Sequence, residues 1–264
     1  MRNKTKLMSL IVIVLLSSIF LGMSNKPERK TVISTRQKVA GEELKLEIEE
    51  GEYWLHELKV IPWLPIIKVK NPPQIAVWIE DEAGNHLKTL YVTKRTAKQE
   101  WRKAPGDSTP KEEIRRKASL PHWAHQRGVQ YADGLYLPTK SNPLADVITS
   151  ATPEGSFELA TKLGSEVKKF IIKAEVNNSA DFNKYYPKDA KLGAKNYSGG
   201  EWGSGQPAVV YAAKVDLTTE QKIYQLKLIG HSSPDGSSGE LVRDLSKLTT
   251  ARGIVDKIKL FKSE

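Results

Sequence analysis

The sequence predicts a mostly β protein: an immunoglobulin-like β-sandwich with long loops and one short helix, preceded by an N-terminal signal segment. Three observations lead to this prediction. Apolar and polar residues alternate in several short segments, as they do in strands that are buried on one face. Connections rich in Gly, Pro and Ser separate these segments. The 3.6-residue period of amphipathic helices is nearly absent, and such a succession of strands is typical of two packed sheets.

The N-terminal residues have the pattern of a secretory signal. Within residues 1–24, three basic residues precede an apolar run, and small residues that suit a signal peptidase follow it. The run is shorter than the ~20 residues of a spanning helix, so a retained N-terminal anchor is the alternative. Residues 25–43 are polar and basic and are interpreted as a tether, which leaves residues 44–264 as a single domain. We therefore expect an exported, periplasmic protein.

Charge and cysteine content exclude several classes of function. The chain carries 41 Lys and Arg against 31 Asp and Glu, a net charge of +10 that is spread along the sequence. Because exported proteins seldom meet nucleic acid, the excess is interpreted as a solvated surface drawn to an anionic membrane face or an acidic partner. No cysteine is present. Disulfides, thiolate metal sites, cysteine nucleophiles and lipoprotein attachment are therefore excluded.

Alternating patterns define the predicted strands. In residues 74–81, Ile75, Val77 and Ile79 face one way and the residues between them face the other. Gly84 and Asn85 can adopt the positive φ of a tight turn, which predicts a hairpin with the next strand. The other predicted strands are residues 86–93, 156–161, 170–176, 209–215, 224–228 and 254–260.

The remaining segments are predicted to be one helix and three long loops. Thr109 and Glu112 match a capping box with Pro110 at the first helical position, which predicts a short helix that ends before Pro121. The loops are residues 137–156, 187–206 and 231–240, which are rich in Gly, Pro, Ser and Lys.

The hairpin sequence AVWIEDEAGNHLKTLYV resembles the predicted periplasmic proteins of domain-of-unknown-function family 2271. Three later stretches agree with it in order, namely DVITSATPEGSF, EVNNSADFNKYYP and GELVRDLSKLTTARGIVDKI, so the resemblance extends over roughly residues 74 to 260. It implies a periplasmic domain, whose relatives are often encoded near flavin-transferase or other redox genes. The family has no established catalytic residues to carry over, and this chain has Ser150 where the family usually has Gly.

The segment from Asp146 to Thr152 also resembles the acceptor motif of exported flavin transferases, an Asp followed by Ser/Thr-Gly-Ala-Thr. The resemblance implies that Thr152 binds FMN through a phosphodiester, with Asp146 holding the register or approaching a metal-bound phosphate. An acceptor hydroxyl must enter another enzyme's active site, so it needs small neighbours and an exposed, extended backbone. The alternative is a hydroxyl-rich turn that leads into a strand.

A second candidate site is the polar cluster in EVNNSADFNKYYP. Asn178, Asp181, Asn183 and Tyr185 are predicted as a ligand rim in which the tyrosine stacks on a ligand. Side chains of these types also cap and bridge the backbone at the end of a strand, which is the alternative interpretation.

Histidines supply the remaining candidate chemistry. His122 and His125 are spaced for one helical turn, and His231 with Asp235 could complete a metal site. A flanking proline and glycine favour an irregular loop instead, so these are interpreted as surface and packing histidines and no metal site is expected. No nucleophile elbow, phosphate loop or zinc helix is present in the sequence, which argues against an enzyme.

We therefore expect a non-enzymatic exported protein that binds a protein partner or small ligand in support of a redox or metal-uptake system, with no resident cofactor. The alternative is a flavinylated electron-transfer protein that carries FMN on Thr152 and has a flavin transferase as its partner. A hydrolase is a third class and requires one histidine, one acid and one hydroxyl in a shared pocket. Nucleic acid is not expected as a partner, and membrane contact would be peripheral or through the N-terminal anchor.

Overall fold

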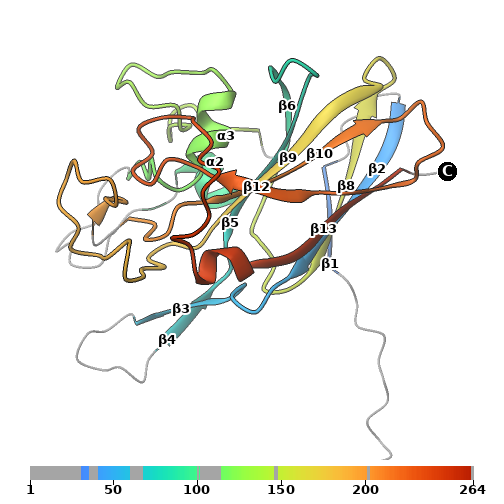
Figure 1. The fold of residues 1–264 in the computed structure, drawn as a ribbon. Coiled ribbons are helices and arrows are strands. Elements are labelled where there is room, and N and C mark those ends of the chain that lie inside the picture. Colours follow the sequence, from blue (N-terminus) through green and yellow to red (C-terminus); the bar gives the residue numbers. More distant parts are fainter. Residues whose placement is uncertain are drawn as a thin grey trace, which may run out of the picture. The chain divides into compact units, whose positions relative to one another are not determined.

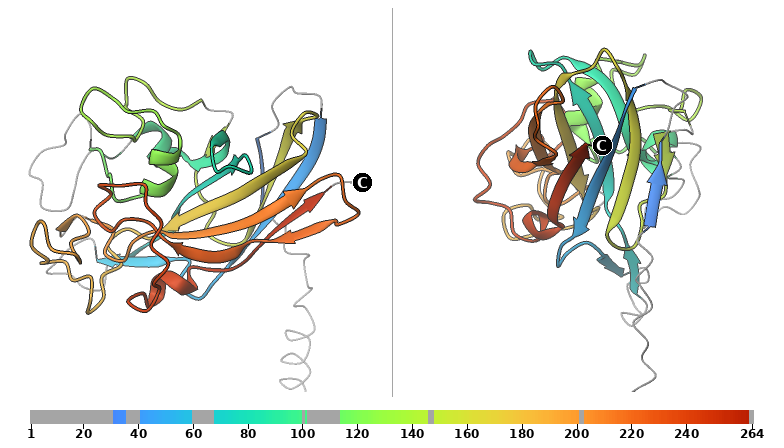
Figure 2. Two further views of the ribbon diagram at one scale, coloured as in Figure 1. Left: turned by 45° about the horizontal axis from the view of Figure 1, so that its top comes forward. Right: turned by 90° about the vertical axis from the view of Figure 1, so that its right-hand side faces the viewer.

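The computed structural model confirms the mostly β prediction and is built around two large sheets packed face to face (Figures 1 and 2). It describes residues 31–35, 41–59, 68–99, 101, 114–145, 148–200 and 203–262. Three sequence predictions lie outside these residues: the signal segment, the helix start at Thr109 and the acid Asp146.

The first layer is a five-stranded sheet. Its strands, in spatial order, are β1 (Thr31–Ser34), β8 (Phe157–Gly164), β2 (Gly41–Glu50), β13 (Val255–Lys262) and β11 (Ile223–Gln225). Only β1 runs parallel to its neighbour, and every other pair is antiparallel. Leu46 of β2 lies opposite Leu159 and Leu260, so apolar side chains from three strands meet on the inner face.

The second layer is a six-stranded sheet. Its strands, in spatial order, are β12 (Lys227–His231), β10 (Val209–Asp216), β9 (Lys169–Asn177), β5 (Gln74–Glu80), β6 (His86–Thr93) and β7 (Thr149–Ser150). The predicted hairpin is β5–β6, and Gly84 has a φ of +89° at its turn. The carboxylate of Asp81 accepts hydrogen bonds from the backbone N–H groups of Ala83 and Asn85, which fixes the turn.

A small hairpin and three short helical segments complete the described elements. They are β3 (His56–Lys59), β4 (Lys68–Asn71), α2 (Lys94–Lys98), α3 (Pro121–Gln126) and the 3₁₀ helix η3 (Thr250–Gly253). The irregular loop expected around His122 is instead the helix α3, because Pro121 occupies its first turn, where a missing N–H costs nothing. In the part of the chain that the structure describes, no helix is both long and apolar enough to cross a membrane.

Part of the predicted tether is ordered as an edge strand. Residues 31–34 form β1, and β2 already begins at Gly41. The sequence interpretation of residues 25–43 as a tether is therefore corrected for these residues. Val32 and Ile33 are β-branched, which favours a strand, and they pair with Glu158 and Leu159 of β8.

The main core lies between the two sheets, and the alternation read from the sequence is confirmed. Ile75, Val77 and Ile79 point into this core together with Phe157. The ring of Phe157 lies 6.2 Å from that of Trp54, a tilted aromatic pair at the centre of the apolar layer.

A second apolar cluster lies on the outer face of the six-stranded sheet. The residues between those of the main core, Ala76 and Trp78 in β5 and Val210 in β10, pack there against Leu120 and Trp123 of the α3 region. Residues 75–80 of β5 are consequently all buried, because the strand is covered on both faces. One half of this outer face is thus a covered core.

One side of the sandwich is joined by a strand that changes sheets. Tyr224 in β11 pairs with Leu260 of the five-stranded sheet, whereas Lys227 in β12 pairs with Ala212 of the six-stranded sheet. The backbone N–H of Leu226 donates to the carbonyl of Ile258, so the crossing itself is hydrogen-bonded. The register of β12 against β10 shifts at Val210/Tyr211, which lets the strand bend at this crossing.

Candidate functional site

The half of the outer face that α3 leaves open forms a basic groove, here called the sheet groove. It has a volume of about 600 Å³ and lies over β9, β10 and the β11–β12 crossing. The outward residues Ile171 and Lys173 of β9 and Ala212 and Lys214 of β10 alternate along their strands and line it. Its basic residues are Lys173, Lys214, Lys227 and Arg243, and its apolar floor includes Ile171, Ala212 and Ile229. Among the described residues, no acidic side chain lines the groove.

Lys173 lies at the boundary between the sheet groove and the covered core. Its ammonium nitrogen is 2.9 Å from a carboxylate oxygen of Glu80 and 3.2 Å from Nε2 of His122. The side chains of Lys173 and Glu80 are only 12 % and 2 % exposed, so this is a mostly buried ion pair. The indole N–H of Trp78 donates to the second Glu80 oxygen at 2.8 Å, which completes the carboxylate's hydrogen bonds.

Glu175 is the fully buried acid of the same strand, two residues beyond Lys173. Its two carboxylate oxygens accept the backbone N–H groups of His122 at 3.2 Å and Trp123 at 2.7 Å, in the first turn of α3. Burial raises the pKa of Glu175 to about 7, although these N–H groups and nearby Lys173 favour the charged form. The carboxylate thereby anchors α3 to the outer face of the sheet.

His122 is buried between Lys173 and the loop that follows β12. Its Nδ1 lies 2.7 Å from the carbonyl oxygen of Gly239 and must donate to it, which leaves Nε2 to accept from Lys173. Burial lowers the pKa of His122 to about 4, so the ring is neutral at physiological pH. A Cβ at Gly239 would lie 2.4 Å from Cβ of His125, so a glycine is needed for this close approach.

The other predicted histidines do not join His122 in a metal site. His125 stacks on the ring of Tyr136 at 4.1 Å, and Nδ1 of His231 bonds the carbonyl of Ser232 at 2.7 Å. Asp235 accepts hydrogen bonds from Ser237 in its own turn. Within the described ranges, no three His, Cys, Asp or Glu side chains lie together in a group that could hold a metal ion.

The predicted FMN acceptor Thr152 has a buried side chain. The residue is 6 % exposed, and its hydroxyl lies 2.7 Å from that of Thr93, which in turn bonds the backbone of Ile75. An open groove of about 640 Å³ adjoins it, lined by residues 31–35 and 149–154. The exposed acceptor hydroxyl that flavin transfer needs is therefore not presented in this conformation, although space for a ligand lies next to it.

The predicted ligand rim directs its polar groups mainly to the protein's own loops. The amide of Asn178 donates to the carbonyl of Tyr53 at 2.8 Å, and Asp181 accepts from the hydroxyl of Thr250 at 2.7 Å. Asn183 accepts the backbone N–H of Tyr185 and donates to the carbonyl of Lys247. These contacts fit the alternative interpretation of backbone bridging, whereas Tyr185 itself is 38 % exposed.

Sequence reasoning named His122 but missed its partners and the sheet groove. The signal that could have found them is the alternation of residues 170–176, because it places Lys173 and Glu175 on the face opposite the main core. Lys214 and Lys227 are likewise outward residues of neighbouring strands, but their proximity depends on the bend between β11 and β12.

In comparisons with known proteins, no family model, curated protein or solved structure matches the chain. The resemblance to family 2271 accordingly stays a prediction from the sequence.

Proposed function

We propose that the protein is an exported, non-enzymatic binding protein whose sheet groove takes a small carboxylate- or phosphate-bearing ligand. The observation that carries the proposal is the lining itself, four basic side chains with no acid among the described lining residues. Lys214, Lys227 and Arg243 form no ion pair with a described carboxylate, so their charge is available to an anion. The volume of about 600 Å³ falls in the range of small-molecule sites.

The groove's chemistry supports binding rather than conversion. Ile171, Ala212 and Ile229 offer an apolar floor, and the cations at its rim would orient an anionic group. Burial strongly shifts the pKa values of Glu175, beneath α3, and of His122, within α3, and neither residue lines the groove. A role in support of a redox or metal-uptake system rests on the family resemblance, and periplasmic location rests on the signal pattern.

Calorimetric titration with inorganic phosphate, citrate and 4-nitrophenyl phosphate tests the proposal. We expect measurable binding of at least one anion and at least a tenfold weaker affinity in the triple variant Lys214→Gln, Lys227→Gln, Arg243→Gln, because three charge-assisted contacts are lost. A second triple variant, Lys188→Gln, Lys191→Gln, Lys195→Gln, removes the same charge from a loop outside the groove. Equal weakening in both variants, or no binding to any of the three anions, would overturn the proposal.

FMN attachment at Thr152 is the second candidate function, and the adjoining groove of about 640 Å³ favours it by offering room for a flavin ring. The attachment requires the bond between the hydroxyls of Thr152 and Thr93 to open first. Intact-mass measurement after co-expression with an active flavin transferase checks it. An added FMN mass that is lost in Thr152→Ala supports attachment, and an unchanged mass eliminates it.

A further inference from the structure

The loop between β9 and β10 carries a second group of lysines, none of which lines the sheet groove. Residues 184–197, here called the basic loop, contain Lys184, Lys188, Lys191 and Lys195 against a single acid, Asp189, which gives 4 − 1 = +3 in fourteen residues. All four lysines are exposed, and none forms an ion pair with a described carboxylate. An exposed cluster of one sign creates a local positive potential.

The basic loop is held in a defined shape although it has no regular secondary structure. The side-chain amide of Asn196 donates to the carbonyl of Tyr185 at 2.8 Å, which ties the two ends of the loop together. Within it, the N–H of Ala194 donates to the carbonyl of Lys191 at 3.0 Å, and Gly193 has a φ of +86°. Closed ends and internal turns are the features of a compact Ω-loop, so its tip is presented in a fixed arrangement.

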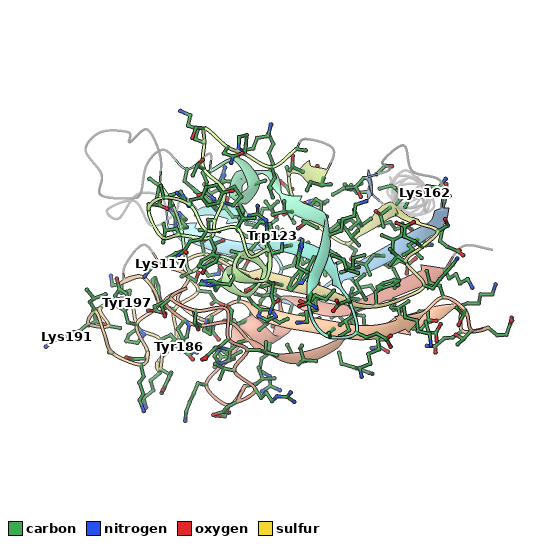
Figure 3. All side chains as sticks on the ribbon, turned by 90° about the horizontal axis from the view of Figure 1, so that it is seen from above. Lys117, Trp123, Lys162, Tyr186, Lys191 and Tyr197 are labelled. Carbon is green, nitrogen blue, oxygen red and sulfur yellow. The ribbon has the colours of Figure 1, made fainter. Side chains whose placement is uncertain are left out.

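The tip of the basic loop presents an apolar side chain between two lysines. Leu192 is 82 % exposed, the highest value among the large hydrophobic residues of the described chain. Lys191 precedes it at the outer end of the molecule, and Tyr197 lies nearer the body of the protein (Figure 3). Tyr185, which is 38 % exposed, lies at the base of the loop with Nζ of Lys247 5.4 Å from its ring centroid.

We propose that the basic loop docks the protein on an anionic lipid surface. The lysines would contact lipid phosphates, Leu192 would enter the boundary between headgroups and acyl chains, and the tyrosines would lie at headgroup level. Charge complementarity alone would equally suit an acidic protein. The exposed leucine at the tip favours lipid, because an apolar side chain can enter the acyl boundary of a membrane. The inference is independent of the sheet groove, since none of these residues lines it.

Vesicle co-sedimentation tests the charge requirement with the whole chain. Phosphatidylcholine vesicles with a minority of phosphatidylglycerol should bind the protein, whereas pure phosphatidylcholine vesicles should not, and high salt should release it. The Lys188→Gln, Lys191→Gln, Lys195→Gln variant should bind at least tenfold more weakly, because each basic residue near an anionic surface contributes roughly a factor of five. The matched control, Lys214→Gln, Lys227→Gln, Arg243→Gln, should bind within about twofold of the unaltered chain.

Leu192→Ser tests the apolar contact without changing the charge. We expect affinity for the anionic vesicles to fall by about three- to tenfold. The absence of cysteine allows a second measurement: a single Leu192→Cys variant labelled with an environment-sensitive fluorophore should brighten on vesicle binding. The same label at Ile223→Cys, which is also exposed but lies in β11, should not change.

Three results would overturn the proposal. One is equal binding to both kinds of vesicle. Another is equal loss of binding in the two triple variants, which would indicate a general charge effect. The third is binding to poly-glutamate that is as strong as binding to the anionic vesicles and depends on the same lysines. Together with no effect of Leu192→Ser and no fluorescence change, it would assign an acidic protein partner to the loop instead.

Discussion

The covered and open halves of the six-stranded sheet's outer face share strands β9 and β10 but have opposite chemistry. Beneath α3, Glu175 and Trp78 lie in a sealed layer where every described carboxylate oxygen has a hydrogen-bond partner. Along the open half, Lys214 and Lys227 project into solvent without a described carboxylate partner. The difference shows that the cover formed by the α3 region decides whether an outward residue of this sheet is sealed from solvent or left exposed to it.

The largest effect is expected from uncovering the sealed half. Trp123→Ala removes a fully buried indole that belongs to the same apolar cluster as Trp78 and donates to the hydroxyl of Thr89 at 3.0 Å. We expect the free energy of unfolding to fall by about 3–5 kcal/mol, because the substitution leaves a large cavity. Urea denaturation measures it, and a loss below about 1 kcal/mol would show that the cover contributes little.

The boundary between the halves should be the next most sensitive place. Lys173→Met leaves the buried Glu80 carboxylate without its cation, at a cost of about 2–4 kcal/mol of stability. The double variant Lys173→Met, Glu80→Gln removes both charges and should recover most of this loss. Urea denaturation of Lys173→Met, Glu80→Gln and the double variant gives the free energies of unfolding for a double-mutant cycle. If the double variant is as unstable as Lys173→Met, the packing of Lys173 rather than its charge stabilises the protein.

The pH dependence of stability should become steeper when the sealed half loses its histidine. Burial lowers the pKa of His122 to about 4 from 6.5, so its contribution to stability is lost as pH falls through this window. Burial raises the pKa of Glu175 to about 7 from 4.5, so its contribution is gained as pH falls from 7 to 4.5.

Each shift corresponds to about 3 kcal/mol, and the two oppose one another in the unaltered chain. In His122→Gln only the glutamate's contribution remains, so the melting temperature should rise as pH falls from 7 to 4.5. Melting curves at stepped pH values check this. A variant that follows the unaltered profile would show that His122 does not titrate in the way its burial implies.

The smallest effect is expected in the open half. Lys214→Ala should change the free energy of unfolding by no more than about 0.5 kcal/mol, because the side chain is exposed and has no described ion pair. Anion affinity should nevertheless weaken, and measuring both quantities on one preparation separates stability from binding. A clear loss of stability would show that this half also serves folding.

Several strands could be predicted from the sequence because they depend on local alternation, although β2, which also alternates, was not among the predicted strands. Ile75, Val77 and Ile79 were correctly placed together on one face of β5, because successive side chains of a strand alternate between its two faces. The interpretation around His122 was wrong, because Pro121 and Gly128 are compatible with both a loop and a short helix. What decides for the helix is Glu175, more than fifty residues away, which accepts the first N–H groups of α3.

The sheet groove was also harder to predict, because it depends on contacts between segments that are distant in the sequence. Lys173, Lys214 and Lys227 belong to three strands, and only the ladder β9–β10–β12 brings them to one face. Thr152 could be selected by its motif, but its exposure depends on Thr93, which arrives from the β5–β6 hairpin. Local patterns therefore predict elements, whereas the sites depend on how distant elements pair.

The pairing of β2 with β13 also determines when the chain can fold. Glu49 and Lys259 are in contact across 210 positions of sequence, and β2 is a central strand of its sheet. A chain emerging from a ribosome cannot complete this sheet until residues 255–262 have emerged. Such non-local pairing slows folding, so the five-stranded sheet is completed only after nearly all of the described chain has been synthesised.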